Sequence, residues 1–173
     1  MDEIDTIMEY WDLYNENREK INKKHLRSNI NELNPGEYHI VVNIWIINEQ
    51  NEILITQRHP NKEFGLKWEC PGGSIIAGED SITGALREVE EEIGIKLNKE
   101  NGRLIHTRKR EMDFKDTYLF KVNINIKKTK LQKNEVINIK LVTKQELLEM
   151  LDNNEIAEPI IEDVLKLIEM KIV

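Results

Sequence analysis

Residues 73–95 read GSIIAGEDSITGALREVEEEIGI, and this stretch decides how the rest of the chain is interpreted. Ser81–Ile93 is expected to form a helix. Asp80 is a favourable N-cap residue because its carboxylate can accept from the first free backbone amides. Gly94 is typical of a helix end because glycine adopts the left-handed conformation without steric cost. The stretch therefore predicts a loop that leads into one well-delimited helix.

The predicted helix carries an apolar face with a strip of carboxylates beside it. At about 100° per residue, one face gathers the apolar residues Ile82, Leu86, Val89 and Ile93. The adjoining strip holds Glu88, Glu91 and Glu92. Like charges at helical spacing repel by a few tenths of a kcal/mol per pair. The strip is either a solvated acidic face, which is usual for a charge run, or a site for hard divalent cations, which take oxygen ligands.

The residues around the strip favour the cation site. The stretch fits the pattern G-x5-E-x7-R-E-U-x-E-E-x-G-U, where U is a bulky aliphatic residue. All nine specified positions are filled, by Gly73, Glu79, Arg87, Glu88, Val89, Glu91, Glu92, Gly94 and Ile95. With this motif the chain resembles the Nudix hydrolase family. The resemblance implies an α/β fold, the Nudix α/β/α sandwich with a mixed sheet. It also implies hydrolysis of a diphosphate bond in a small molecule such as a nucleoside diphosphate derivative, with Mg²⁺ or Mn²⁺ as cofactor.

The resemblance also implies the metal ligands. Gly73 lets the backbone approach the metal, and a carbonyl near it is an expected ligand. Glu88 and Glu92, one turn apart, are the first choices among the carboxylates. Glu91 is expected to bind a second ion or to hold water on the metal, which makes it a catalytic candidate as well.

Two further residues are catalytic candidates by the same resemblance. Arg87 is expected to pair with Glu79 and to hold the loop against the helix; the alternative is an ordinary surface ion pair. Glu135, which precedes a predicted strand, is the candidate general base, with an exposed loop glutamate as the alternative. Asp113 and Asp116, in a turn-like stretch, are weaker candidates for an additional acid.

Substrate phosphates need cations, and the segment just after a predicted strand supplies two. Arg58 and Lys62 are the expected diphosphate ligands, since arginine can bind a diphosphate through two parallel hydrogen bonds. Trp68 either lines the substrate pocket or packs in the core.

The upstream stretch also resembles the isopentenyl-diphosphate isomerase branch of the superfamily, which makes isomerase the main rival function. The resemblance rests on the upstream extension, on His39 at a strand start and on the Arg58–Lys62 spacing. Those isomerases place a catalytic cysteine just before the motif glycine and a metal-binding histidine just after it. Here these positions hold Gly72 and Ser74, so hydrolysis is favoured. A non-catalytic nucleotide-sensing module is the second alternative, although such modules usually lose motif glutamates.

The rest of the chain alternates predicted strands and helices. Two hairpins and a further strand are expected, over His39–Ile47 with Glu52–Arg58, Arg103–Glu111 with Thr117–Ile126, and Val136–Val142. Two C-terminal helices are expected over Lys144–Leu151 and Pro159–Ile172. Strands before and after a central helix predict a sandwich of helices and sheet. The segment 8–26 is ambiguous.

Composition limits the class of protein. The length of 173 residues suits one domain, 1–173, on which an extension formed by residues 1–37 is expected to pack. The net charge, 25 − 32 = −7, disfavours nucleic acid and anionic membranes as partners. The single cysteine, Cys70, and an acidic N-terminus unlike a signal peptide favour the cytoplasm. A homodimer is common among resembling proteins.

Overall fold

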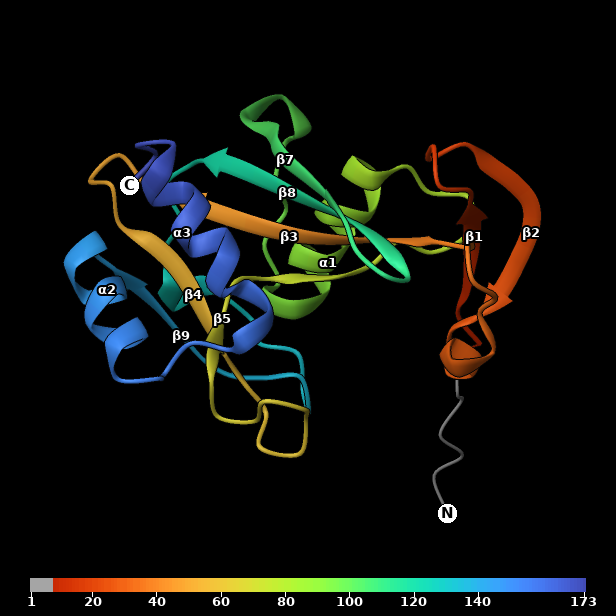
Figure 1. The fold of residues 1–173 in the computed structure, drawn as a ribbon. Coiled ribbons are helices and arrows are strands. Elements are labelled where there is room, and N and C mark those ends of the chain that lie inside the picture. The colour runs from red at the N-terminus through yellow and green to blue at the C-terminus, as the bar shows by residue number, and fades with distance from the viewer. Residues whose placement is uncertain (1–7) are drawn as a thin grey trace, which may run out of the picture.

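A computed structural model describes residues 8–173; the first seven residues of the extension lie outside this range. A seven-stranded mixed sheet forms the centre of the molecule (Figure 1). Its strands run in the order β5-β4-β3-β8-β7, and β6 pairs with β3 while β9 pairs with β4. The bounds of the sheet strands are β3 His39–Ile47, β4 Ile53–Arg58, β5 Trp68–Glu69, β6 Gly72–Ser74, β7 Gly102–Lys109, β8 Asp113–Lys121 and β9 Val136–Val142.

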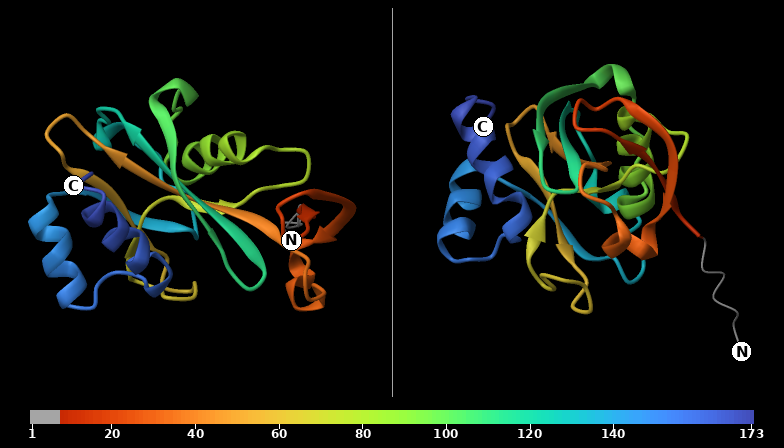
Figure 2. Two further views of the ribbon diagram at one scale, coloured as in Figure 1. Left: turned by 45° about the horizontal axis from the view of Figure 1, so that its top comes forward. Right: turned by 45° about the vertical axis from the view of Figure 1, so that its right-hand side comes forward.

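Helices cover both faces of this sheet, as the two turned views show (Figure 2). Helix α1 covers one face, and α2 with α3 covers the other. The three helices are α1 Ser81–Ile93, α2 Lys144–Asp152 and α3 Ile161–Glu169. Short 3-10 turns lie at Arg27–Glu32, Lys99–Asn101, Ile126–Lys128 and Glu158–Ile160. The expected α/β/α sandwich with a mixed sheet is confirmed.

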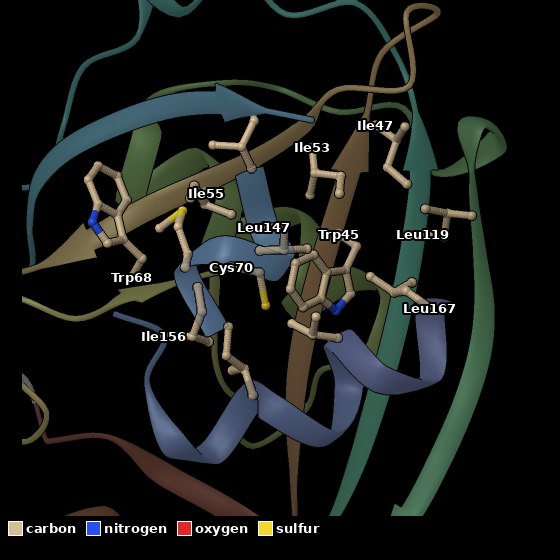
Figure 3. Packing of buried hydrophobic residues seen from close by; sticks show 14 residues of the cluster. Trp45, Ile47, Ile53, Ile55, Trp68, Cys70, Leu119, Leu147, Ile156 and Leu167 are labelled. Atoms are coloured by element: carbon tan, nitrogen blue, oxygen red, sulfur yellow. The ribbon is translucent and has the colours of Figure 1, made fainter. Parts of the chain in front are cut away.

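Strand β3 is apolar on both sides because both sides are buried. Ile44 and Ile46 pack with Val89 of α1 in one core. Trp45 and Ile47 point the other way, into the core beneath α2 and α3 (Figure 3). The side chains of β3 therefore join the two layers.

The bounds of helix α1 and of strands β3 and β9 were predicted correctly from local sequence signals. Helix α1 spans Ser81–Ile93 as expected, and the Asp80 side chain accepts from the Thr83 amide at 2.8 Å. Gly94 ends the helix at φ 71°, in the left-handed region that favours glycine. Strands β3 and β9 also have the expected bounds.

The expected pairing of the strands was only partly right. β3 and β4 are antiparallel neighbours but meet in register only at Ile47 and Ile53. Beyond this pair, β3 runs parallel to β8, whereas β4 pairs with β9. The pair β7–β8 is the expected antiparallel one, but β8 starts at Asp113 rather than Thr117. Three of its first four residues are polar, namely Asp113, Lys115 and Asp116, yet the backbone of β3 supplies their strand partners.

The ambiguous N-terminal segment forms a second, two-stranded antiparallel sheet. Its strands are β1 Tyr10–Tyr14 and β2 Lys20–Leu26, at the end of the molecule where β3 begins (Figure 1). Among residues 8–173, no helix combines the length and apolar character needed to cross a bilayer.

Candidate active site

The first residues of the motif form strand β6, which brings them next to the central strand. Gly72–Ser74 pairs antiparallel with Val41–Asn43 of β3, and α1 packs against β6. A Cβ atom built on Gly73 would come within 2.5 Å of the Glu88 carboxylate. The Glu88 side chain therefore lies against the backbone of Gly73, and only glycine leaves room for it there.

Two of the motif glutamates are buried at this point. Glu88 is 8% exposed and Glu92 is 7% exposed. Burial raises the pKa of Glu88, which Arg87 opposes and Glu91 reinforces. Burial also raises the pKa of Glu92, and the charges of Glu69 and Glu88 raise it further. Their ionised forms are therefore costly unless a cation compensates them.

One oxygen of this pair has no partner. Oε2 of Glu92 is buried and accepts no hydrogen bond within the described part of the chain. Buried polar atoms are nearly always partnered, so an orphaned carboxylate oxygen calls for a missing donor or cation. Oxygen ligands from two buried carboxylates fit the chemistry of a hard divalent cation.

Arg87 ties the loop of the motif to the acidic strip. Its Nε and Nη2 donate to Glu79 at 2.8 and 3.0 Å, which is the expected pair. Its Nη1 donates to Glu88 at 2.9 Å and to Glu91 at 3.1 Å, and Nη2 also reaches the Ser74 carbonyl at 3.1 Å. Five hydrogen bonds from a largely buried guanidinium exceed what a surface ion pair makes.

The carboxylates are not yet gathered around a common point. Within residues 8–173, no three acidic, histidine or cysteine side chains lie close enough to hold a metal ion as they stand. The carboxylates of Glu88 and Glu91 both accept from Arg87, and Glu91 is half-exposed. Coordination of one cation by Glu88, Glu91 and Glu92 together would therefore require these side chains to rearrange.

A cavity of about 220 Å³ opens beside strand β6. Its polar lining comes from Gly72–Ser74 and from Asn43, Arg58, Glu63, Glu69, Arg110 and Lys115. Phe64 and Arg110 also line a second hollow of about 580 Å³ next to it. The motif glycine thus faces a space that could receive a small molecule.

Every cation in this lining is paired with a carboxylate. The ion pairs are Arg58 with Glu69 at 2.6 Å, Arg110 with Asp113 at 2.7 Å, and Lys115 with Asp163 at 2.9 Å. The last pair is buried, with Lys115 at 2% and Asp163 at 3% exposed. The cavity therefore holds three cationic groups without a strong positive charge.

The expected site residues outside the motif are only partly brought together. Arg58 lines the cavity, as expected for a substrate ligand. Lys62 and Glu135 form an ion pair with each other and do not line this cavity. Trp68 lies in the core beneath α2 and α3 (Figure 3), where Lys140 sits over its ring at 4.3 Å. The pocket role expected for Trp68 has no support in this arrangement.

The remaining candidates have structural surroundings. His39 is buried and its ring stacks on Trp11 at 3.7 Å. Cys70 is buried, and burial raises the pKa of its thiol, which disfavours the nucleophilic thiolate. Asp113 and Asp116 lie in a strand rather than a turn and are ion-paired with Arg110 and Arg18.

Sequence reasoning missed several residues of the site, namely Asn43, Phe64, Glu69, Arg110, Lys115 and Asp163. The one available signal was Glu69, because an acidic residue directly before a glycine-rich loop suggests a site. The others reach the cavity only through long-range strand and helix packing.

The comparisons with known proteins give the class and the family of this chain, a hydrolase that acts on pyrophosphate bonds. A family model described as the NUDIX domain matches residues 37–164. The chain belongs to the Nudix hydrolase family. It is 39% identical over 142 residues to an uncharacterized Nudix hydrolase of Listeria monocytogenes, covering 81% of this chain and 83% of that protein.

Two further comparisons cover different parts of the chain. Over 50 residues it is 46% identical to the 8-oxo-dGTP diphosphatase of Escherichia coli, which covers 29% of this chain and 39% of that protein. The crystal structure of DR0079 from Deinococcus radiodurans matches with a TM-score of 0.72 at 21% identity. That match covers 91% of this chain and 98% of the other, and it shows the shared fold.

Proposed function

We propose that this chain is a Mg²⁺-dependent hydrolase that cleaves the diphosphate bond of a small molecule such as a nucleoside diphosphate derivative. The observation that carries the proposal is the buried pair Glu88 and Glu92. Glu88 lies against the backbone of Gly73, and Glu92 has one carboxylate oxygen without a partner in the described residues. A bound cation would supply the missing partner of Glu92 and would offset the charge of the two buried carboxylates.

Glu88 and Glu92 would hold Mg²⁺, with the carbonyl near Gly73 and the half-exposed Glu91 as further ligands. Mn²⁺, which takes similar oxygen ligands, would substitute. The bound ion would offset the charge of the phosphates and make water a better nucleophile. Arg87 keeps Glu88 and Glu91 in place through the hydrogen bonds described above.

The diphosphate would lie in the cavity against Arg58 and Arg110. Both guanidinium groups already bind carboxylates, so a substrate phosphate would have to share or replace these partners. Phe64 supports a nucleoside as the remaining part of the substrate. Its backbone has φ 54°, which a bulky residue rarely adopts, and such outliers cluster at functional sites. A ring held there offers a stacking surface for a base.

Glu135 is our candidate for the general base. Its carboxylate is ion-paired with Lys62, so it can accept a proton from water only when Lys62 moves away. Lys62 lies near enough to Glu69 and Glu92 for their charges to raise its pKa, although burial lowers that pKa more strongly. A substrate phosphate that attracts Lys62 would release the Glu135 carboxylate. The two expected roles, phosphate ligand and base, would then be coupled.

The rival proposal is an enzyme like the isopentenyl-diphosphate isomerases, on the resemblance carried by Arg58, Lys62 and His39. His39 is buried with its ring stacked on Trp11, and among residues 8–173 it does not lie in a group of three His, Cys, Asp or Glu side chains that could hold a metal ion, which does not favour a metal ligand. A sensor without catalysis is the second rival. The acidic, disulfide-free sequence favours a cytoplasmic protein, and a homodimer is our expectation for its assembly.

The test is a substrate panel with Mg²⁺ or Mn²⁺, for wild type, Glu92→Gln and Glu90→Gln in parallel. Glu90 is exposed on the same helix and is the matched control. We expect metal-dependent release of phosphate or nucleotide that falls about 10³-fold in Glu92→Gln and is unchanged in Glu90→Gln. Isomerised product without phosphate release would favour the isomerase. Tight ligand binding without turnover would favour the sensor.

A further inference from the structure

The N-terminal hairpin β1–β2 is anchored on the start of strand β3. The rings of Trp11 and His39 are buried and stack almost parallel, with an interplanar angle of 4°. Tyr14 and Tyr38 exchange backbone hydrogen bonds of 2.8 and 2.9 Å. The hairpin is therefore held by packing and by backbone pairing.

From this anchor, β1 holds the loop of the catalytic motif by two backbone amides. The Ala77 amide donates to the Tyr10 carbonyl at 2.7 Å, and the Gly78 amide donates to the Asp12 carboxylate at 2.7 Å. Asp12 is only 6% exposed, and Lys20 pairs with it at 2.7 Å. Burial tends to raise the pKa of Asp12, but the hydrogen bonds from Lys20 and Gly78 lower it, which keeps the carboxylate ionised.

A second contact from the hairpin reaches the start of helix α1. Arg18, in the turn between β1 and β2, forms a two-pronged ion pair with Asp116, and its Nη1 lies 2.7 Å from Oδ1. Asp116 is fully buried in β8 and also accepts from Thr107 at 2.7 Å and from the Ser81 hydroxyl. Ser81 is the first residue of α1. The hairpin thus fixes both the loop before the helix and the strand that holds its first residue.

We propose that the hairpin β1–β2 is a positioning element of the active site, with Asp12 and Arg18 as its positioning residues. Gly78, which Asp12 holds at φ 92°, directly precedes Glu79. Glu79 binds Arg87, and Arg87 in turn binds Glu88. The placement of the acidic strip therefore depends on a carboxylate 66 residues before Gly78 in the chain.

This inference rests on the proposed function, because it assigns the hairpin a part in the same catalytic site. Loss of the Asp12 contact frees the Gly78 amide and lets Glu79 move, so that Arg87 no longer fixes Glu88 and Glu91. A displacement of about 1 Å at a reacting group can cost about 100-fold in rate. The effect should fall on kcat, since neither Asp12 nor Arg18 lines the substrate cavity.

The kinetic test compares Asp12→Ala with Glu9→Ala, which breaks the Glu9–Arg27 ion pair of the same hairpin. We expect Asp12→Ala to lower kcat about 10- to 100-fold with KM changed less than about threefold. Glu9→Ala should behave like wild type. Asp12→Asn retains an acceptor oxygen for Gly78, so it should recover part of the lost kcat, and it also serves if the alanine variant does not fold.

Amide hydrogen exchange tests the coupling without relying on activity. In Asp12→Ala, and to a smaller extent in Asp12→Asn, exchange should accelerate at Ala77 and Gly78 and also at Glu79 and the first turn of α1. Acceleration confined to Ala77 and Gly78, with kcat unchanged, would overturn the inference. If wild type hydrolyses nothing in the panel, the proposed function fails. Hydrogen exchange still tests the hairpin in that case, because faster exchange that extends to Glu79 and α1 supports the positioning role and faster exchange limited to Ala77 and Gly78 contradicts it.

Discussion

Protonation of the buried imidazole of His39 should destabilise the fold as the pH falls. The side chain is 3% exposed, and burial lowers its pKa from 6.5 to about 4, against a smaller opposing effect of Asp113. Between these values the unfolded chain binds a proton that the folded chain does not, so stability is present above pH 6.5 and lost as the pH falls toward 4. The difference, 6.5 − 4 = 2.5, corresponds to ~3 kcal/mol at about 1.4 kcal/mol per unit, of which ~2 kcal/mol is lost by pH 5.

Urea unfolding at pH 7 and pH 5 measures this loss, for wild type and for His39→Gln, which cannot titrate. Carboxylates titrate in both proteins, so the difference between their pH slopes isolates His39. Wild type should lose ~2 kcal/mol more than the variant between these pH values. His25→Gln removes a second imidazole, whose ring lies 6.4 Å from that of Trp11, and is measured in parallel as the comparison variant. Equal losses in wild type and His39→Gln would refute the argument.

Two further substitutions test the site. Gly73→Ala should lower kcat at least about tenfold, because the added Cβ would displace the Glu88 carboxylate. Steady-state kinetics at saturating Mg²⁺ measures this, and a kcat equal to that of wild type would contradict it. Phe64→Ala should raise KM about tenfold for nucleoside diphosphates, at an unchanged kcat, by loss of base stacking. For a diphosphate that lacks a base, KM of Phe64→Ala should equal that of wild type. The control variants Phe64→Tyr, which keeps an aromatic ring, and Leu66→Ala should leave KM for nucleoside diphosphates unchanged.

How much of the fold the sequence could predict depends on how local the signals are. Helix α1 was predicted to the residue because Asp80 and Gly94 mark its ends within the segment itself. The turn at residues 48–51 likewise fixed β3 and β4 as neighbours at Ile47 and Ile53. The partner of β4 beyond that turn is β9, whose paired residues lie between 136 − 58 = 78 and 142 − 53 = 89 positions later in the chain. This pairing follows from how the whole sheet closes. Strand pairing at such separation leaves no mark in either segment alone.

The same distinction applies to the site. The contact of Arg87 with Glu79 could be predicted because both residues lie within the motif. The contact of Asp12 with Gly78 could not, since nothing around Asp12 distinguishes it from the other acidic residues near the N-terminus. A family motif describes the residues that carry it, whereas the residues that hold it in place can lie outside the segment 37–164 that the family model matches.

The net charge of −7 raised the question of how an acidic protein could bind a diphosphate. Local cations explain diphosphate binding only in part, because the positive charges of Arg58, Arg110 and Lys115 are each neutralised by an ion-paired carboxylate. Glu88 and Glu92 add further negative charge beside the cavity. A diphosphate that enters alone would therefore meet a site that is close to neutral or repulsive. On the proposed function, its affinity would come mainly from divalent cations bound to the motif, so we expect substrate KM to rise steeply as Mg²⁺ is withdrawn.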